Sequence, residues 1–223
     1  MAERYGEVPP KFTKAWWGYF WMYYKWPVLG TVLAAIIIIV TIVQCAGKEK
    51  YDLIVNFCTS ELYDSQVTEN VEKSLAAYTE DADGNGESNV FFQQIAFYND
   101  SVNAELDYTL QMKHDMELTA DCSFLYIYDK AEADIMLARD EIDNVYVDAA
   151  QWAGDAINDG REVLYSKTGK ACAVSLAGSK YLEEMGIKSD GLYVAVRMDY
   201  SDKDINKASQ RSAMETGRMM LEK

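Results

Sequence analysis

Polar side chains follow three apolar runs of the sequence, at points where buried strands would end. They are Thr59 with Ser60, then Asn99, and then Arg139 with Asp140. In parallel α/β sheets, ligands bind outside the carboxyl ends of the strands. A Ser60 hydroxyl there would offer hydrogen bonds, and the Arg139 guanidinium would offer a forked cation to a carboxylate or phosphate. We therefore take these five residues as a candidate ligand site. The plainer alternative is that Ser60 caps a helix and Arg139 pairs with a surface carboxylate.

A second pattern, Asp81-x-Asp-x-Asn-Gly86, matches the opening of a calcium-binding loop. Such a loop needs a bidentate Glu at its twelfth position, where this sequence has Phe92. We interpret residues 81–86 as a turn between a helix and a strand, and we predict no metal site. The single histidine, His114, cannot build a histidine-rich metal site, and no nucleophile–base pair is recognisable. We therefore expect no catalytic residue, no cofactor and no enzymatic activity.

Three cysteines follow the apolar segment described below, namely Cys58, Cys122 and Cys172. Their number is odd, and a bridge between Cys58 and Cys122 is geometrically poor for the elements we expect. Buried free thiols are the default expectation, because an unpaired cysteine behaves as a small apolar side chain. A bridge between Cys122 and Cys172 stays open as an alternative.

The formal charge of −15 is divided unevenly along the 223 residues. Residues 1–46 hold four basic and two acidic side chains and carry +2, whereas residues 47–223 hold 17 basic and 34 acidic ones and carry −17. An acidic surface repels phosphates, so nucleic acid is excluded as a partner. With 49% hydrophobic residues, the chain can bury a core.

The 22 residues Trp26–Gly47 carry no formal charge. As a helix they would span about 33 Å, enough to cross the hydrocarbon layer of a bilayer. We predict an interfacial segment over 1–25, a break at Pro27, and a transmembrane helix over 26–47; the alternative is one continuous helix kinked at Pro27. Tyr and Trp rings favour the membrane–water boundary. We expect this boundary to hold Trp16, Trp17, Tyr19, Trp21, Tyr23, Tyr24 and Trp26.

The orientation in the cell membrane follows from the basic residues that flank the span. Four of them precede it, and only Lys48 and Lys50 closely follow it. This count favours a cytoplasmic N-terminus and an extracytoplasmic C-terminal domain. The competing interpretation is a cleaved signal with lipid attached at Cys45, although Gln44 departs from the small residue that such a site requires.

Residues 51–223 have the size of one domain. Their apolar runs and turn residues predict strands alternating with helices. The stretch 122–128 has strand propensity, yet no Gly or Pro occurs from Glu87 to Ala153, and we favour a long helix over 104–130 there. Otherwise we expect strands at 51–58, 89–98, 133–138 and 191–198, a hairpin over 163–176, and helices at 61–78, 141–157, 180–185 and 202–221.

Strands that alternate with helices predict a mostly parallel sheet with helices on both faces, hence a three-layer α/β domain over 51–223. In layout, the chain resembles uncharacterised single-pass membrane proteins of Clostridia and other Firmicutes. The resemblance rests on Tyr23–Pro27, Lys130–Leu137, Leu182–Ile187 and Gly191–Val196. It implies that the outer domain is similar to one lobe of a reduced periplasmic-type solute-binding protein. It carries no activity that could be transferred.

Two functions of different classes follow from these expectations. The first is a membrane-anchored extracytoplasmic module of solute-binding type, acting as a sensor or accessory, with the lipid bilayer and a small solute as partners. The second is an interaction protein without a small ligand. Its aromatic segment would dock on another membrane protein and its acidic domain would act as a scaffold.

Overall fold

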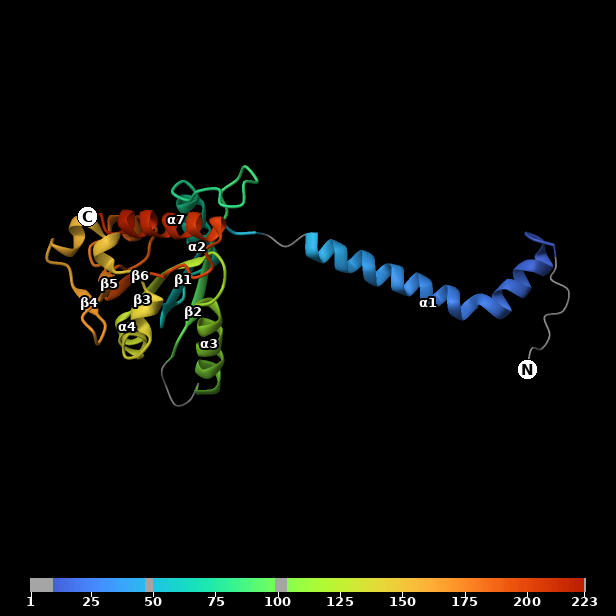
Figure 1. Ribbon diagram of the computed structural model, residues 1–223, viewed down its shortest axis with the longest axis horizontal. Helices are drawn as coiled ribbons and strands as arrows, with labels where there is room; N and C mark the ends of the chain where they lie inside the picture. Colours follow the sequence, from blue (N-terminus) through green and yellow to red (C-terminus); the bar gives the residue numbers. More distant parts are fainter. Residues whose placement is uncertain (1–9, 47–49, 99–103, 223) are drawn as a thin grey trace. The chain divides into compact units, whose positions relative to one another are not determined.

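The computed structural model describes residues 10–46, 50–98 and 104–222, apart from the side chains of Tyr23 and residues 44–46. The chain divides into two compact units, 1–49 and 50–223 (Figure 1).

The N-terminal unit is dominated by one long helix, α1 (Lys14–Ala46). Pro27 lies inside it, so the break that we predicted there is wrong, and the alternative of a continuous helix is what the structure has. Pro lacks the N–H that would bond to the preceding turn, and its ring crowds that turn, so it bends a helix without necessarily ending it. Figure 1 shows α1 as a bent helix.

The segment Tyr24–Val43 of α1 has a mean hydropathy of 2.6, and none of its side chains is buried. It is long and apolar enough to cross a membrane, although a signal sequence near the N-terminus would pass the same test. At its start, the rings of Phe12, Trp16, Phe20 and Tyr24 contact one another at four-residue spacing, with centroids 5.3–5.5 Å apart. Of the predicted boundary residues, Trp16 and Tyr19 are half-buried, and the exposed ones are Trp17, Trp21, Tyr24 and Trp26.

The C-terminal unit is built on a six-stranded sheet with the order β2-β1-β3-β6-β5-β4. The strands β1, β2 and β3 are parallel, whereas β6, β5 and β4 are joined through antiparallel pairs. The sheet is therefore mixed, and our expectation of a mostly parallel sheet is wrong. The strand bounds are Leu53–Thr59 for β1, Val90–Ala96 for β2, Ser123–Asp129 for β3, Val163–Tyr165 for β4, Ala171–Ser175 for β5 and Leu192–Val196 for β6.

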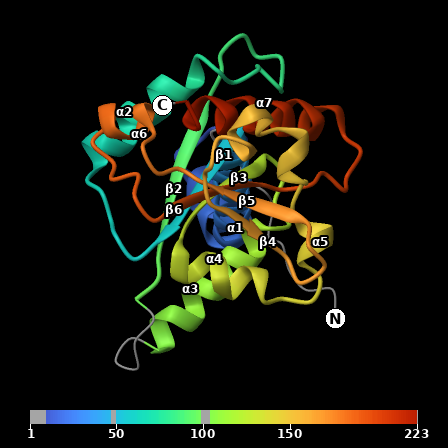
Figure 2. The same ribbon diagram turned by 90° about the vertical axis from the view of Figure 1, so that its left-hand side faces the viewer.

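Helices cover both faces of this sheet, which gives the three layers that we expected (Figure 2). One face carries α2 (Ser65–Ala76), α6 (Lys180–Glu184) and α7 (Asp204–Met220). The other face carries α3 (Ala104–Glu117), α4 (Lys130–Leu137) and α5 (Ile142–Val145). Two short 3₁₀ helices, 149–151 and 154–157, pack in the core on the α7 side.

Alternation along the central strand separates two cores. Leu125 and Ile127 of β3 point toward α7 and α2, where the larger aliphatic core lies. Tyr126 and Tyr128 point to the opposite side, toward α3 and α4, into a core that is rich in tyrosine. Side chains two apart along a strand share a face, so β3 separates an aliphatic layer from an aromatic one.

The long helix that we favoured over 104–130 is wrong. Instead, α3 ends at Glu117, and the chain turns into β3 at Ser123. Cys122 takes a positive φ of 65°, a conformation that a helix cannot contain. The turn therefore forms without the Gly or Pro that we had required as punctuation.

The strand predicted at 133–138 is also wrong, because this segment forms α4. The Asp129 carboxylate accepts a hydrogen bond from the Glu132 N–H and so caps that helix. The helix expected over 141–157 is interrupted after Val145, where Tyr146 bridges to Arg197 in the sheet.

The C-terminal third of the chain agrees closely with the elements that we predicted. The hairpin over 163–176, the short helix stopped at Gly186, the strand within 191–198 and the closing helix are all confirmed. Gly186 has a φ of 79°, as a residue that ends a helix often has. Near the N-terminal end of the domain, α2 begins at Ser65 with Asp64 as its cap, so Ser60 is not the cap that we predicted.

Candidate functional site

The predicted site residues separate to opposite ends of the sheet. Thr59 and Ser60 lie at the carboxyl end of β1, beside Asp129 at the end of β3. The Ser60 N–H donates to Asp129 Oδ2 over 2.9 Å, and the Thr59 hydroxyl donates to the Glu61 carbonyl. The cavity there has a volume of only about 120 Å³. Asn99 lies outside the described residues.

Arg139 and Asp140 lie at the other end, because 133–138 is not a strand. The helix α4 begins at the carboxyl end of β3 and carries the chain back along the sheet, so Arg139 emerges near the amino end. Asp140 is 91% exposed and pairs with Lys167 over 2.6 Å. The expected convergence of Thr59, Ser60, Arg139 and Asp140 on one edge is therefore wrong.

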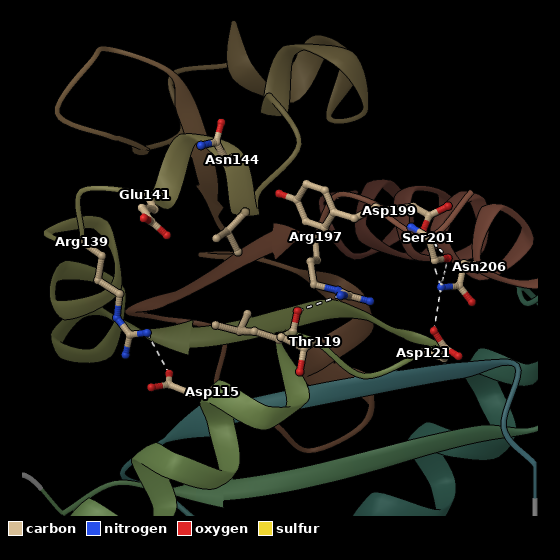
Figure 3. A pocket seen from close by; sticks show the side chains of 13 residues that line it. Asp115, Thr119, Asp121, Arg139, Glu141, Asn144, Arg197, Asp199, Ser201 and Asn206 are labelled. Carbon is tan, nitrogen blue, oxygen red and sulfur yellow. Dashed lines mark hydrogen bonds and ion pairs between the residues drawn. The ribbon is translucent and has the colours of Figure 1, made fainter. Parts of the chain in front are cut away.

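A larger cavity, with a volume of about 610 Å³, lies at this amino end (Figure 3). Its walls come from the end of α3, the turn before β3, the α4–α5 connection, and the chain between β6 and α7. It forms here because β6 is antiparallel to β3, so the exit from β6 meets the entry to β3. The charged and amide side chains that line it are Asp115, Asp121, Arg139, Glu141, Asn144, Arg197, Asp199 and Asn206.

Arg139 contributes a half-exposed guanidinium to this cavity. Its Nη1 lies 2.8 Å from Asp115 Oδ1, so the surface pairing that we weighed as an alternative is present. Burial acts to raise the pKa of Asp115, but the Arg139 guanidinium outweighs it and holds that pKa below its ordinary value. Asp115 also approaches His114 Nδ1 at 3.4 Å, which joins the cavity wall to the protein interior.

Arg197 is the buried cation of the site, with only 4% of its surface exposed. Its guanidinium stacks 4.3 Å from the ring centroid of Phe124. It donates to the carbonyls of Leu118, Ala120 and Ser123 over 2.7–2.8 Å. Within residues 10–46, 50–98 and 104–222, no carboxylate lies within ion-pair distance of it. The positive charge is thus stabilised mainly by carbonyl dipoles and by the face of the Phe124 ring.

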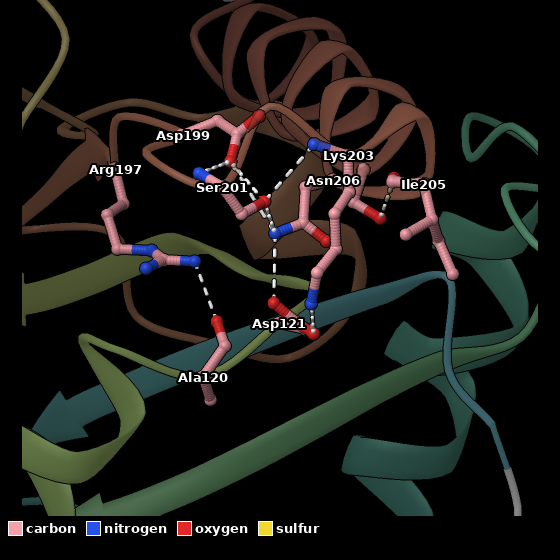
Figure 4. A network of polar contacts seen from close by, with 9 residues as sticks. Ala120, Asp121, Arg197, Asp199, Ser201, Lys203, Ile205 and Asn206 are labelled. Carbon is pink, nitrogen blue, oxygen red and sulfur yellow. Dashed lines mark hydrogen bonds and ion pairs between the residues drawn. The ribbon is translucent and has the colours of Figure 1, made fainter.

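Beyond Arg197, a polar network closes the end of the cavity (Figure 4). Asn206 is buried, and its amide N–H₂ donates to Asp121, at 3.0 Å, and to the Ser201 hydroxyl, at 2.7 Å. Hydrogen bonds from Lys203 and Asn206 lower the pKa of Asp121, and Lys203 Nζ lies 2.7 Å from its carboxylate. Asp199 Oδ1 accepts from the Ser201 N–H and hydroxyl.

The orientation of the Asn206 amide follows from its partners, since its nitrogen faces three acceptors, Asp121, Ser201 and, at 3.5 Å, Asp199. Its Oδ1 is left buried without a hydrogen-bond partner in the described part of the chain. A buried acceptor without a donor carries a free-energy cost, so this position is one that a bound donor or water would stabilise.

A group of buried aromatic side chains lies behind the cavity wall. His114 Nε2 lies 2.8 Å from the Tyr128 hydroxyl, which in turn lies 2.5 Å from the Tyr146 hydroxyl. Burial lowers the pKa of His114 to about 4, so the ring is neutral near pH 7. Burial likewise raises the pKa values of Tyr128 and Cys58, which keeps both groups protonated.

The acidic loop behaves as the predicted turn. Asp81 accepts hydrogen bonds from the N–H groups of Gly84, Asn85 and Gly86. Oxygens of Asp52, Asp81 and Asp83 lie within 4.8 Å of one another, a spacing at which a cation could bind. The buried Asp52 carboxylate, however, already accepts backbone N–H groups of this loop, which accounts for its position.

The three cysteines Cys58, Cys122 and Cys172 are free and buried, as expected, and the alternative bridge between Cys122 and Cys172 is not formed.

Sequence reasoning missed Arg197, Asp199 and Asn206. The available signal was an arginine placed directly after the apolar run 192–196, where the next strand residue would be apolar. Nothing in the sequence shows that β6 runs antiparallel to β3, and this pairing is what places Arg197 beside the α3–β3 turn.

No family model, curated protein or solved structure matches this chain. The resemblance to reduced solute-binding proteins therefore stays a hypothesis.

Proposed function

We propose that this protein is a membrane-anchored, extracytoplasmic module that binds a small polar solute and acts as a sensor or accessory. The observation that carries the proposal is the cavity of about 610 Å³ with the buried Arg197 in its wall. This volume falls within the roughly 300–1,000 Å³ of small-molecule sites, in which a few polar groups fix the ligand among apolar walls.

The lining supports this use of the cavity. Leu118, Val145 and Tyr200 provide apolar surface, and Arg139 and Arg197 provide planar donors. A guanidinium partly removed from water binds an anionic group more strongly than an exposed one, because the local dielectric is lower. Cavity and charge together suit a polar solute better than a lipid or a nucleic acid.

The anchor supports the proposed location. Helix α1 presents an apolar, exposed segment over Tyr24–Val43, in which Lys25 near the start is the one charged residue, with aromatic residues before it. We place this segment in the cell membrane as a single pass, with residues 1–25 on the cytoplasmic side and the domain outside, according to the basic residues that precede the span. The lipid bilayer is then one partner, and the solute is the other.

The test is a ligand screen on the purified full chain in detergent micelles. Its thermal unfolding is followed against separate panels of amino acids, peptides, sugars and metal ions. A ligand that binds only the native state raises Tm in a saturable way. We expect such a shift from at least one polar solute. A flat response to every panel would rule out the proposal, and co-purification of one fixed membrane protein would then favour the second candidate function.

The second candidate function is an interaction protein without a small ligand, and the exposed aromatic surface of α1 favours it. Trp17 and Trp21 are 54% and 59% exposed on a helical part that precedes the uncharged span. Tryptophan anchors are common where two proteins meet. Replacing both by alanine should release a bound membrane protein under this alternative and leave solute binding unchanged under the first proposal.

A further inference from the structure

Two walls of the cavity present the same arrangement of charges. Arg139 is followed two residues later by Glu141, and Arg197 is followed two residues later by Asp199. All four side chains line the cavity. Figure 3 shows Arg139 and Glu141 on one side and Asp199 on the other, with Arg197 between them. Each wall thus offers one cation and one anion.

Pairing within the protein leaves charges of both signs available. Arg139 pairs with Asp115 through Nη1, so its other N–H groups can still donate to a ligand, and Asp121 pairs with Lys203. Over the described ranges, Glu141, Arg197 and Asp199 form no ion pair. A ligand with only a negative charge would satisfy Arg197 and face two carboxylates, and a ligand with only a positive charge would face the buried guanidinium.

Arg197 and Asp199 also have hydrogen-bonding capacity left for a ligand that carries both a negative and a positive group. A guanidinium has five N–H donors, and Arg197 uses three of them on carbonyl groups, so two are left for an acceptor such as a carboxylate. Asp199 Oδ1 is held by Ser201, which orients the carboxylate and leaves Oδ2 for a donor such as an ammonium group.

We propose that the cavity binds a small zwitterion, an amino acid or a short peptide. Its carboxylate lies against Arg197 and Arg139, and its ammonium group lies against Asp199 and Glu141. The inference rests on the proposed function, because it names the class of solute that the same cavity takes. It adds that both charges of the solute are required.

The experiment removes one ligand charge at a time. The probes are the twenty common L-amino acids and glycylglycine, each titrated against the full chain in detergent micelles while Tm is measured. The probe with the largest shift is then compared with its N-acetyl derivative, which lacks the ammonium group, and with its C-terminal amide, which lacks the carboxylate. We expect both derivatives to need roughly tenfold to hundredfold higher concentrations for the same shift, as for a lost charge-assisted hydrogen bond.

Variants assign the two charges to the two sets of residues. Asp199→Asn keeps the size of the side chain and removes its charge, and Arg139→Gln replaces the guanidinium by a shorter, uncharged polar group. Arg197 is left unchanged because it ties the α3–β3 turn together. Arg139→Gln should weaken binding of the parent probe and leave binding of its amide unchanged. Asp199→Asn should weaken binding of the parent probe and leave binding of its N-acetyl derivative unchanged. The control is Arg211→Gln, since Arg211 pairs with Glu80 away from the cavity, and it should bind as the wild type does.

The outcomes separate this inference from the function on which it rests. Equal shifts with the parent and either derivative would overturn the zwitterion and keep a solute-binding module. A shift from a sugar or a simple carboxylate, with none from the amino acids or glycylglycine, would do the same. No shift from any panel would overturn the proposed function as well.

Discussion

His114 connects the wall of the cavity to the buried tyrosines. Asp115 lies on one side of its ring and the Tyr128 hydroxyl on the other, while Phe97 and Tyr126 pack against it. The ring is 1% exposed, and its pKa in the folded protein is about 4, against an ordinary 6.5. Between about pH 6.5 and pH 4, His114 therefore stays neutral in the folded protein and becomes protonated in the unfolded chain.

This difference makes the stability depend on pH. As the pH falls from about 6.5 to about 4, the unfolded chain gains a proton on His114 that the folded protein does not, so the free energy of unfolding decreases, by about 3 kcal/mol over the interval. Above about 6.5 the contribution is constant. The His114→Gln variant should lack this part of the slope. Urea unfolding at pH 7 and pH 4.5 checks it, and parallel losses in variant and wild type would contradict it.

The site residues show how far single positions can be predicted. Arg139 was selected because it follows an apolar run, and it does line a cavity, but the apolar run is a helix and the cavity is at the other end of the sheet. Arg197 was not selected, because its role depends on carbonyls 74–79 positions earlier in the chain. The type of a residue indicates which ligand groups it could bind. The pairing of the strands determines which of these residues lie together in one site.

Helix α4 turns the chain back along the sheet after β3. The Asp129 carboxylate at its start holds both this helix and the end of β1. Asp129 caps α4 through the Glu132 N–H and also accepts from the Ser60 N–H at the end of β1. Asp64 is a matched control, because its carboxylate caps α2 through the Val67 N–H, over 3.0 Å. Both carboxylates cap a helix, but only Asp129 also accepts a hydrogen bond from the end of a neighbouring strand.

Replacing Asp64 by alanine should cost about 1 kcal/mol of stability, as for other N-caps. Asp129→Ala should cost about 2 kcal/mol, because a second N–H also loses its acceptor. Chemical denaturation of residues 50–223 measures both, since this unit has its own core. Equal losses in the two variants would show that the bond to Ser60 does not contribute.

The elements differ in how well local sequence determines them. The hairpin and α7 were predictable, because Gly169 with a φ of 90° and a long amphipathic stretch are local signals. The β3 and α4 segments were not. The stretch 122–128 has strand propensity, and its Phe124 and Ile127 also fit a helical spacing, so burial between two layers decides the outcome. The turn at Cys122 uses a positive φ on a residue other than glycine, which sequence patterns do not reveal.

At the scale of the whole molecule, the charge of −15 combines a slightly basic N-terminal segment with a strongly acidic domain. The uncharged segment Trp26–Gly47 separates the two. Under our proposal this arrangement places the domain outside the cell, where its acidic surface also disfavours contact with anionic lipid headgroups.

The orientation has a direct consequence for proteolysis. Protease added to intact cells that express the chain should remove the domain of residues 50–223 and leave a short fragment that contains α1. The measurement is an immunoblot with tags at both ends, compared with inverted vesicles, in which the domain should be protected. Protection in cells and cleavage in inverted vesicles would reverse the orientation.

The most direct test of the account is whether the cavity that contains Arg139 is the place where a solute binds. Isothermal titration calorimetry measures this for the full chain in detergent, with the probe that gives the largest shift in Tm. We expect one-site binding in the wild type and in Arg211→Gln, and a Kd at least about tenfold higher in Arg139→Gln. An unchanged Kd in Arg139→Gln, or no binding heat in the wild type, would contradict it.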